Sequence, residues 1–262
     1  MEKKKALLTG RGVSIGYYKG KETQWVADQL DFSLPVGRLA CLLGPNGVGK
    51  STLIKSILGK EMPLKGEILY KGEKIRELSS KVLARKISVV LTDRISAGNL
   101  TVNQLVTLGR IPFTNWLGVL SEEDKMAVDN AIKATNTGYL QDKKIAEISD
   151  GQLQKVMIAR ALAQDGELMI LDEPTAHLDL VNRFEIMHLL RDIARTQNKA
   201  ILVVTHDLEI AVQTADEFWL MPCGGPLISG LPEDLILDGQ INRLLPNPKL
   251  HFSPHSGKIQ LS

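Results

Sequence analysis

The segment that starts at Gly44 has residue types and spacing suited to holding a phosphate group. It reads Gly44-Pro45-Asn46-Gly47-Val48-Gly49-Lys50-Ser51-Thr52 and matches the pattern G-x-x-x-x-G-K-[ST] in full. Its glycines let the backbone curl so that several N–H groups point at one phosphate, and a following helix adds its positive end. Lys50 would hold the β- and γ-phosphates, and Ser51 would offer its hydroxyl to Mg²⁺. We therefore predict a nucleotide site here, and the alternative of a glycine-rich turn that binds nothing is disfavoured by the flanking strand and helix.

Two carboxylates follow a predicted buried strand further along the chain. Residues 168–171 are apolar, and Asp172 and Glu173 come next. Because ligands bind at the carboxyl ends of parallel strands, Asp172 is placed to bind Mg²⁺ directly or through water. Glu173 could act as a general base on an attacking water. An apolar run ending in Asp-Glu is a weak signal alone, but its position downstream of a phosphate loop makes it a strong one.

A histidine follows the next predicted strand. Residues 200–205 are followed directly by His206 and Asp207. A single histidine at a strand end is more often structural than functional. This one, however, would lie at the same sheet edge as Asp172, where it could hydrogen-bond the γ-phosphate.

Upstream of the acidic strand, Ile148-Ser149-Asp150-Gly151-Gln152 opens a predicted helix. Ser149 or Asp150 could cap this helix, and the N–H groups of its first turn attract an anion. The segment alone would be an ordinary helix start. The motifs around it make it a candidate binding segment.

The hydrophobic pattern places these motifs on alternating strands and helices. Strands are predicted at 13–18, 29–34, 38–43, 66–70, 86–91, 167–171, 200–205, 218–221 and 258–261, and helices at 51–58, 180–196 and 207–214. Alternation of buried strands with helices implies a parallel sheet covered by helices. The pattern between 101 and 165 is helical instead, with a capping box at Ser121, and is interpreted as an insertion into the α/β core.

Composition bounds the class of protein. The chain has 262 residues, room for one large domain or two small ones, and no apolar run near the ~18 residues that span a bilayer. A net charge of +2 and an aromatic content of 5% argue against a nucleic-acid partner held by bulk charge or stacking. The basic start is too short for a signal peptide. We expect a soluble cytoplasmic protein, and we expect Cys41 and Cys223 to be buried small hydrophobic residues.

In this order, the motifs resemble those of ATP-binding subunits of ABC (ATP-binding cassette) transporters over roughly 7–230. In the resemblance, the signature lies at Ser149, Ala176-His177-Leu178-Asp179 is the D-loop and His206 is the switch histidine. The resemblance implies an α/β P-loop NTPase fold with a RecA-like core, an antiparallel β subdomain and a helical subdomain at about 100–165. The ATPase domain would span 1–230, and 231–262 would be an extension packed on it.

The resemblance also implies the site. ATP and Mg²⁺ would bind residues 44–52, with Asp172 and Ser51 on the metal, and Lys50, Glu173 and His206 would be catalytic. Tyr17 matches the aromatic residue that stacks on adenine, with Tyr18 as the other candidate. Two chains would form a head-to-tail homodimer, in which Ser149, Gly151, Gln152 and Asp179 contribute to the ATP sites and the signature acts on the γ-phosphate held by the partner.

Two departures from the family pattern bear on catalysis. The signature usually reads Leu-Ser-Gly-Gly-Gln, whereas Asp150 stands at its third position here and adds negative charge near a triphosphate. The family places a glutamine after the strand at 87–91, whereas this chain has Thr92 and Asp93. Either of these residues offers an oxygen to Mg²⁺ or its water, but with less reach than glutamine, so coupling through this position is in doubt.

The segment Leu100-Thr101-Val102-Asn103-Gln104-Leu105-Val106-Thr107-Leu108-Gly109-Arg110-Ile111-Pro112 resembles the T-V-x-x-L-V-x-x-G-R-x-P stretch of importers of iron–siderophore, haem and cobalamin complexes. Within the resemblance, this segment reflects the permease that the subunit docks against. The alternative interpretation is that it is only an amphipathic helix followed by a turn. The implied partners are two integral-membrane permease subunits and a periplasmic or lipoprotein substrate-binding protein, with no nucleic acid. The implied location is the cytoplasmic face of the inner membrane, as a peripheral subunit.

Two other functions remain open at this stage. One is an ABC ATPase outside transport, such as an iron–sulfur cluster assembly subunit, which the altered glutamine position makes more credible. The other is an ATP-binding module with little turnover, given Thr92 and Asp150. The G-R-x-P stretch argues against the first. The second is disfavoured by the intact residues Lys50, Asp172, Glu173 and His206.

Overall fold

A computed structural model describes residues 6–20, 22–91, 99–114, 118–245, 247, 249–253 and 258–261. Thr92 and Asp93, the two candidates for the glutamine position, lie outside these residues.

The central sheet of the described chain has six strands. Their order is β10 (Ile228–Gly230), β9 (Glu217–Leu220), β3 (Leu39–Leu43), β8 (Ala200–Val204), β7 (Leu168–Asp172) and β6 (Ile87–Val90). The strands from β9 to β6 are parallel, and only β10 is antiparallel to its neighbour. Every residue of β3 and β8 is buried, as is typical of parallel strands covered on both faces. The carboxyl ends of β3, β7 and β8 therefore meet at one edge.

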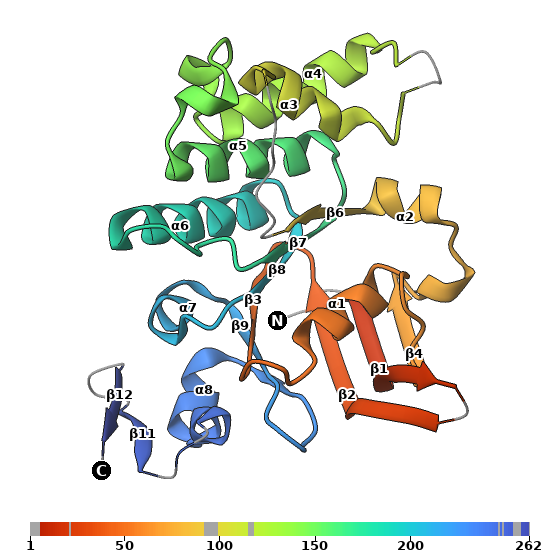
Figure 1. The fold of residues 1–262 in the computed structure, drawn as a ribbon, viewed down its shortest axis with the longest axis vertical. Coiled ribbons are helices and arrows are strands. Elements are labelled where there is room, and N and C mark those ends of the chain that lie inside the picture. Colours follow the sequence, from red (N-terminus) through yellow and green to blue (C-terminus); the bar gives the residue numbers. More distant parts are fainter. Residues whose placement is uncertain are drawn as a thin grey trace.

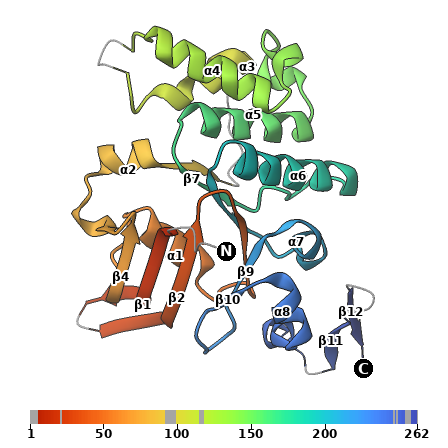
Figure 2. The same cartoon turned by 180° about the vertical axis from the view of Figure 1, so that it is seen from behind.

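Alternate side chains of this sheet serve two separate cores. Leu39, Cys41 and Leu43 of β3 pack with α5 (Asp150–Ala163) and α6 (Leu180–Thr196), whereas Ala40 and Leu42 pack with α1 (Lys50–Ile57). Successive side chains of a strand point to opposite faces. Helix α1 therefore covers one face of the sheet, whereas α5 and α6 lie on the side of the opposite face. Figures 1 and 2 show α1 and α5 separated along the long axis of the molecule in both views.

A second sheet covers the outer side of α1. In this antiparallel sheet the order is β2 (Glu22–Pro35), β1 (Ala6–Lys19), β4 (Lys65–Tyr70) and β5 (Glu73–Lys74). Ile15 of β1 and Leu30 of β2 share a core with Leu53 and Ile57 of α1, so the helix is held between two sheets (Figure 1).

The helices α3 (Val102–Thr107), α4 (Glu122–Ala134) and α5 pack together at the end of the molecule that is uppermost in Figure 1. The remaining elements are α2 (Ser80–Lys86), α7 (Leu208–Thr214), α8 (Pro232–Leu237), and the hairpin of β11 (Leu250–Ser253) and β12 (Lys258–Leu261), with short 3₁₀ turns at 75–77, 108–110, 138–140, 145–147 and 240–244. No helix among the described residues has the length and apolar character needed to cross a bilayer.

Most predicted elements are confirmed, and those with a strong pattern match closely. The bounds of α6 and β12 are as predicted, and Ser121 caps α4 through a box with Asp124. The sequence patterns gave no prediction for α2, α8 or β11. In α2 only Leu83 is buried, so no apolar stripe marks it.

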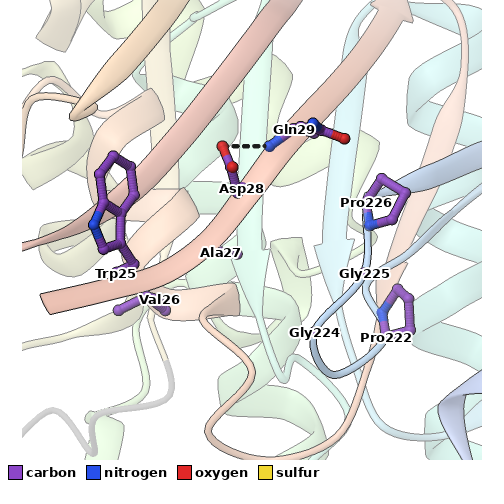
Figure 3. Close-up of a pocket in the computed structure, with 9 residues that line it drawn as sticks. All are labelled: Trp25, Val26, Ala27, Asp28, Gln29, Pro222, Gly224, Gly225 and Pro226. Carbon is purple, nitrogen blue, oxygen red and sulfur yellow. Dashed lines mark hydrogen bonds between the residues drawn. The ribbon is translucent and has the colours of Figure 1, made fainter.

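The two cysteines differ. Cys41 lies buried in β3 as predicted, but the prediction for Cys223 is wrong, since its side chain is exposed. Cys223 comes after the end of β9, in a loop that turns toward β2. Pro222, Gly224, Gly225 and Pro226 of this loop face residues 25–29 across a pocket of about 370 Å³ (Figure 3). The apolar run of β9 ends before the cysteine, and loops lie at the surface.

Gly109 and Arg110, the first two residues of the G-R-x-P stretch, have a packing role. A Cβ atom at Gly109 would lie 2.2 Å from the carbonyl oxygen of Arg160, so only glycine lets these segments approach. Arg110 is buried: its Nε donates to Oδ1 of Asp124 at 2.7 Å, and its Nη1 donates to the carbonyl oxygen of Ala163 at 2.8 Å. Gly109 and Arg110 therefore join α3, α4 and α5. The next residue, Ile111, is largely exposed, at 60%.

We expect Arg110→Met to lower the free energy of unfolding by about 3 kcal/mol, because it leaves the Asp124 carboxylate buried without its cation. Hydrogen bonds from Ser121 and Arg110 hold the pKa of Asp124 below its usual value. A carboxyl group whose pKa is lowered on folding stabilises the fold above its unfolded pKa, and this contribution is lost as the pH falls through the folded pKa. The difference between the wild type and the variant should thus shrink below about pH 4 in denaturant titrations.

Arg76→Met is the matched control, since Arg76 pairs with Glu77 at 3.8 Å and both side chains are mostly exposed. It should leave stability unchanged within error. Equal stability of the Arg110→Met variant and the wild type at neutral pH would contradict the packing role of Arg110.

Candidate nucleotide site

The phosphate loop joins the end of β3 to the start of α1 with a backbone that requires glycine. A Cβ atom at Gly44 would lie 2.5 Å from the carbonyl oxygen of Met221. Gly47 and Gly49 have φ angles of 80° and 112°, in the left-handed region that favours glycine. Gly49 also occupies the N-cap position of α1. The first N–H groups of α1 thus remain directed into the loop, as a phosphate site needs.

Lys50 is held inside this loop. Its Nζ donates to the carbonyl oxygens of Gly44, at 2.7 Å, and Pro45, at 3.0 Å. An ammonium group has three N–H donors, so the side chain can keep this position and still donate to a phosphate oxygen. Burial lowers the pKa of Lys50, whereas the carboxylates of Glu173 and Asp172 act in the opposite direction. The phosphate loop and the acidic residues follow β3 and β7, which both pair in parallel with β8, so they lie at the same edge of the sheet.

The first turn of α1 connects to Tyr17. Ser51 is exposed at the helix start, and the Oγ1 of Thr52 shares a hydrogen bond with the hydroxyl group of Tyr17. Tyr17 is 38% exposed, whereas Tyr18 is 75% exposed, and the register pairs Tyr17 with Gln24 of β2. The tie to α1 favours Tyr17 over Tyr18 as the residue next to a nucleotide.

Asp172 and Glu173 lie where β7 ends. Asp172 is paired with Val204 of β8, and Glu173 follows with a φ of 49° while its N–H donates to the carbonyl oxygen of Val204 at 2.8 Å. A positive φ is unfavourable for a residue with a side chain and is found at functional sites. The backbone bond to β8 holds this conformation and directs the carboxylate toward the next strand end.

His206 meets Glu173 there. Its Nδ1 lies 2.9 Å from Oε1 of Glu173. The imidazole is 70% exposed, whereas the carboxylate is only 20% exposed. The two residues that the sequence analysis assigned to water activation and γ-phosphate binding are therefore direct neighbours, although 33 positions separate them in the chain.

The signature segment begins α5. Ser149, and not Asp150, is the N-cap: its Oγ accepts from the backbone N–H of Gln152, and the Gln152 side chain accepts from the N–H of Ser149. Asp150 is exposed in the first turn. A Cβ atom at Gly151 would lie 2.7 Å from Oδ1 of Asn182, so glycine is required for α5 to lie against α6.

The D-loop ends at Asp179, the N-cap of α6. Its carboxylate accepts from the backbone N–H of Asn182 at 2.9 Å and from Nδ2 of Asn182 at 2.6 Å. These bonds lower the pKa of Asp179. Asn182 thus contacts both the signature and the D-loop. No sequence motif marks Asn182, and the signal that could have found it is its position three residues after a capping aspartate.

The candidate site residues that the structure describes fall into two spatial groups. Lys50, Asp172, Glu173 and His206 lie around one sheet edge, together with Tyr17 and the rest of the loop at 44–52. The signature helix α5 packs with the core on the opposite face of the sheet from α1. The structure therefore does not bring Ser149 to the phosphate loop of the same chain.

The donor set fits Mg²⁺ bound with a phosphate. Within the described residues, no group of three or more His, Cys, Asp or Glu side chains is placed to hold a metal by itself. Mg²⁺ at nucleotide sites takes one or two protein oxygens and completes its shell with phosphates and water. The Ser51 hydroxyl and the Asp172 carboxylate supply that number of oxygens.

The sequence profile of ABC transporters matches residues 27–176. The chain belongs to the ABC transporter family. An ABC transporter ATP-binding protein of Methanocaldococcus jannaschii, itself uncharacterized, is 38% identical over 97% of this chain and 87% of that protein. The achromobactin transport ATP-binding protein of Dickeya dadantii is 37% identical over 93% and 92% of the two chains. The ferric enterobactin transport ATP-binding protein of Escherichia coli is 34% identical over 91% and 87%.

Solved structures agree with this assignment. The structure of cbiO1 from Clostridium perfringens, part of the ABC transporter complex cbiONQ, has a TM-score of 0.79 and 29% identity, covering 92% of this chain and 94% of that chain. A bacterial ABC transporter cassette in a dimeric structure has a TM-score of 0.70 and 25% identity, covering 86% and 98%. The P-loop NTPase fold of the ABC type, expected from the resemblance, is confirmed. This ABC protein is an ATP-binding subunit and an ATPase whose hydrolysis is coupled to transport.

We expect Glu173→Gln to lower kcat for ATP hydrolysis by at least about 100-fold, because an amide cannot accept the proton of the attacking water. ATP affinity should stay close to that of the wild type, since the carboxylate is not part of the phosphate loop. Steady-state phosphate release and titration with a fluorescent ATP analogue measure the two quantities.

Glu167→Gln is the control, because Glu167 pairs with Lys71 through partly exposed side chains at 2.7 Å, at the opposite end of β7. It should leave kcat unchanged. Undiminished turnover in the Glu173→Gln variant would rule out Glu173 as the general base.

Proposed function

We propose that this chain powers the import of a metal chelate, a ferric siderophore, haem or cobalamin, through separate permease subunits. The observation that carries this proposal is the near full-length similarity to ATP-binding proteins named for achromobactin and ferric enterobactin transport. The segment at 100–112 agrees with it, because its pattern resembles that of chelate importers. The comparisons give no support to the iron–sulfur assembly alternative.

The geometry supports a division of roles in the hydrolysis step. The N–H groups of residues 44–52 and the Lys50 ammonium bind the β- and γ-phosphates. Ser51 and Asp172 would hold Mg²⁺, which would neutralise phosphate charge. Glu173 accepts the proton of the water that attacks the γ-phosphorus, and His206 donates a hydrogen bond to the γ-phosphate. ADP and phosphate leave as products.

The hydrogen bond between Glu173 and His206 implies that the contacts of these two side chains change when ATP binds. It joins the carboxylate that must face a water to the imidazole that must face a phosphate. ATP binding therefore exchanges this bond for contacts with the substrate. The His206 side chain is mostly exposed and has room to move, whereas the Glu173 side chain is more buried and its backbone N–H is bonded to β8. We infer that the histidine is the side chain that shifts.

A head-to-tail homodimer completes the site. Because α1 and α5 pack on opposite faces of the sheet, the signature of one chain is free to serve the phosphate loop of a second chain. Ser149, Gly151 and Gln152 would then contact the partner's ATP, and Asp179 would lie near both chains. A related bacterial cassette has been solved in a dimeric structure, which supports a dimer of this chain.

The rest of the organisation follows from the same assignment. Residues 1–230 form the ATPase domain, with the helical subdomain at about 100–165. The extension at 231–262 is packed on it, as supported by Leu235, Ile241 and Phe252, which are buried in the same core as Phe218 of β9. The subunit works peripherally on the cytoplasmic face of the membrane, with two permease subunits and a periplasmic or lipoprotein binding protein. Thr92 or Asp93 takes the place of the family's glutamine.

Mixing two inactive variants tests the composite site. Lys50→Met and Ser149→Ala chains should each be inactive, whereas a mixture allowed to exchange subunits should regain ATP hydrolysis. The physical reason is that a mixed dimer holds one site with both motifs intact only if the signature acts across the interface. Mixtures that stay inactive although chains demonstrably exchange would contradict this geometry.

Reconstitution tests the transport role. With its permease in liposomes, ATP hydrolysis should rise when binding protein loaded with a ferric siderophore, haem or cobalamin is added, because a loaded binding protein favours the closed ATPase dimer. Unloaded binding protein is the control. Hydrolysis that responds to none of the three chelates would overturn the substrate class while leaving the ATPase assignment intact.

A further inference from the structure

We propose that Arg183 is a positioning residue for ATP hydrolysis, which ties the end of the D-loop to the loop that carries His206. The inference rests on the proposed roles of Glu173 and His206. It adds a residue that the motifs do not contain and assigns it a measurable effect on turnover.

Arg183 bridges two segments that are far apart in the chain. It lies in the first turn of α6, where its Nε donates to the carbonyl oxygen of Leu178 at 2.7 Å. Its Nη1 donates to Oδ2 of Asp207 at 3.2 Å. Leu178 precedes the D-loop aspartate, and Asp207 follows His206. One guanidinium group thus holds both loops.

The loop around His206 is fixed on each side of the histidine. Oδ1 of Asp207 accepts from the N–H of Ile210 and so caps α7, while the N–H of Asp207 donates to Oγ1 of Thr205 at 3.0 Å. Arg183 takes the other carboxylate oxygen of Asp207. The backbone of His206 is therefore held between two anchored neighbours, which limits the positions that its imidazole can take at the strand edge.

The contacts of Arg183 with Leu178 and Asp207 matter for the position of His206 more than for the stability of the fold. Arg183 is 39% exposed, and an ion pair of that exposure adds little to stability. A reacting group displaced by about 1 Å can lose about two orders of magnitude in rate. The planar guanidinium group donates in two fixed directions, whereas a lysine has one point charge. Loss of Arg183 should therefore affect turnover far more than folding.

The Arg183 side chain lies in open surroundings, so replacing it neither overpacks the hydrophobic core nor leaves a cavity in it. Arg183, His206, Asp207, Phe252 and Ile259 line an open pocket of about 330 Å³ between α7 and the C-terminal hairpin. A shorter or uncharged side chain at position 183 has room there. Phe252 itself is buried and anchored by its backbone N–H to Asn242, so the hairpin does not depend on Arg183.

We expect Arg183→Met to lower kcat by about tenfold, the size of effect that follows from losing charge-assisted hydrogen bonds that orient a reacting group. KM for ATP should change less than twofold by this reasoning, because the phosphate loop is untouched. Arg183→Lys should recover part of kcat, since it keeps one donor. Glu185→Gln breaks another α6 ion pair, Lys155–Glu185 at 2.7 Å, and should leave kcat unchanged.

A double-mutant cycle separates positioning from a general loss of structure. In the His206→Ala background, Arg183→Met should have no further effect on the residual kcat, because the group that it positions is gone. Thermal melting of all variants should be within error of the wild type. An unchanged kcat in Arg183→Met, or effects of the two substitutions that multiply, would overturn the inference. Full activity of His206→Ala alone would instead overturn the proposed role of His206.

Discussion

The parallel arrangement of β3, β8 and β7 is the constraint on which the site depends. Neighbouring parallel strands end at the same edge, so the loops that follow them are brought side by side whatever their separation in the chain. Gly44 follows β3, Glu173 follows β7, and His206 comes just after β8. Burial of the strands on both faces fixes their register, because a shift by one residue would exchange the side chains of the two cores.

The same sheet explains why one chain holds an incomplete site. Alternate side chains of β3 serve two cores, which place α1 and the signature helix α5 on different faces. A helix start can present its N–H groups only where its own packing puts them, and α5 is fixed against α6 by the contact of Gly151 with Asn182. The separation of the signature from the phosphate loop is therefore a consequence of packing, and in the proposed dimer a second copy supplies the missing segment.

Local strain at the strand ends is balanced by hydrogen bonds to neighbouring elements. Glu173 has a positive φ that the backbone bond to Val204 sustains, and the D-loop residue His177 also has a positive φ, of 64°. Lys50 is buried, and two carbonyl oxygens satisfy it. Arg183 joins the strained D-loop to the loop that carries His206. The candidate site residues are thus held in place by hydrogen bonds to neighbouring strands and helices.

The amino-acid sequence by itself determined the phosphate loop, the acidic strand end and elements with strong periodicity such as α6, because these depend on residues close together in the chain. It also indicated the family through the order of its motifs. Only the tertiary structure decided that Arg110 is buried against Asp124, that Cys223 is exposed, and that Arg183 reaches Asp207. Burial and pairing at these positions depend on which elements pack together, and local periodicity carries no information about such distant contacts.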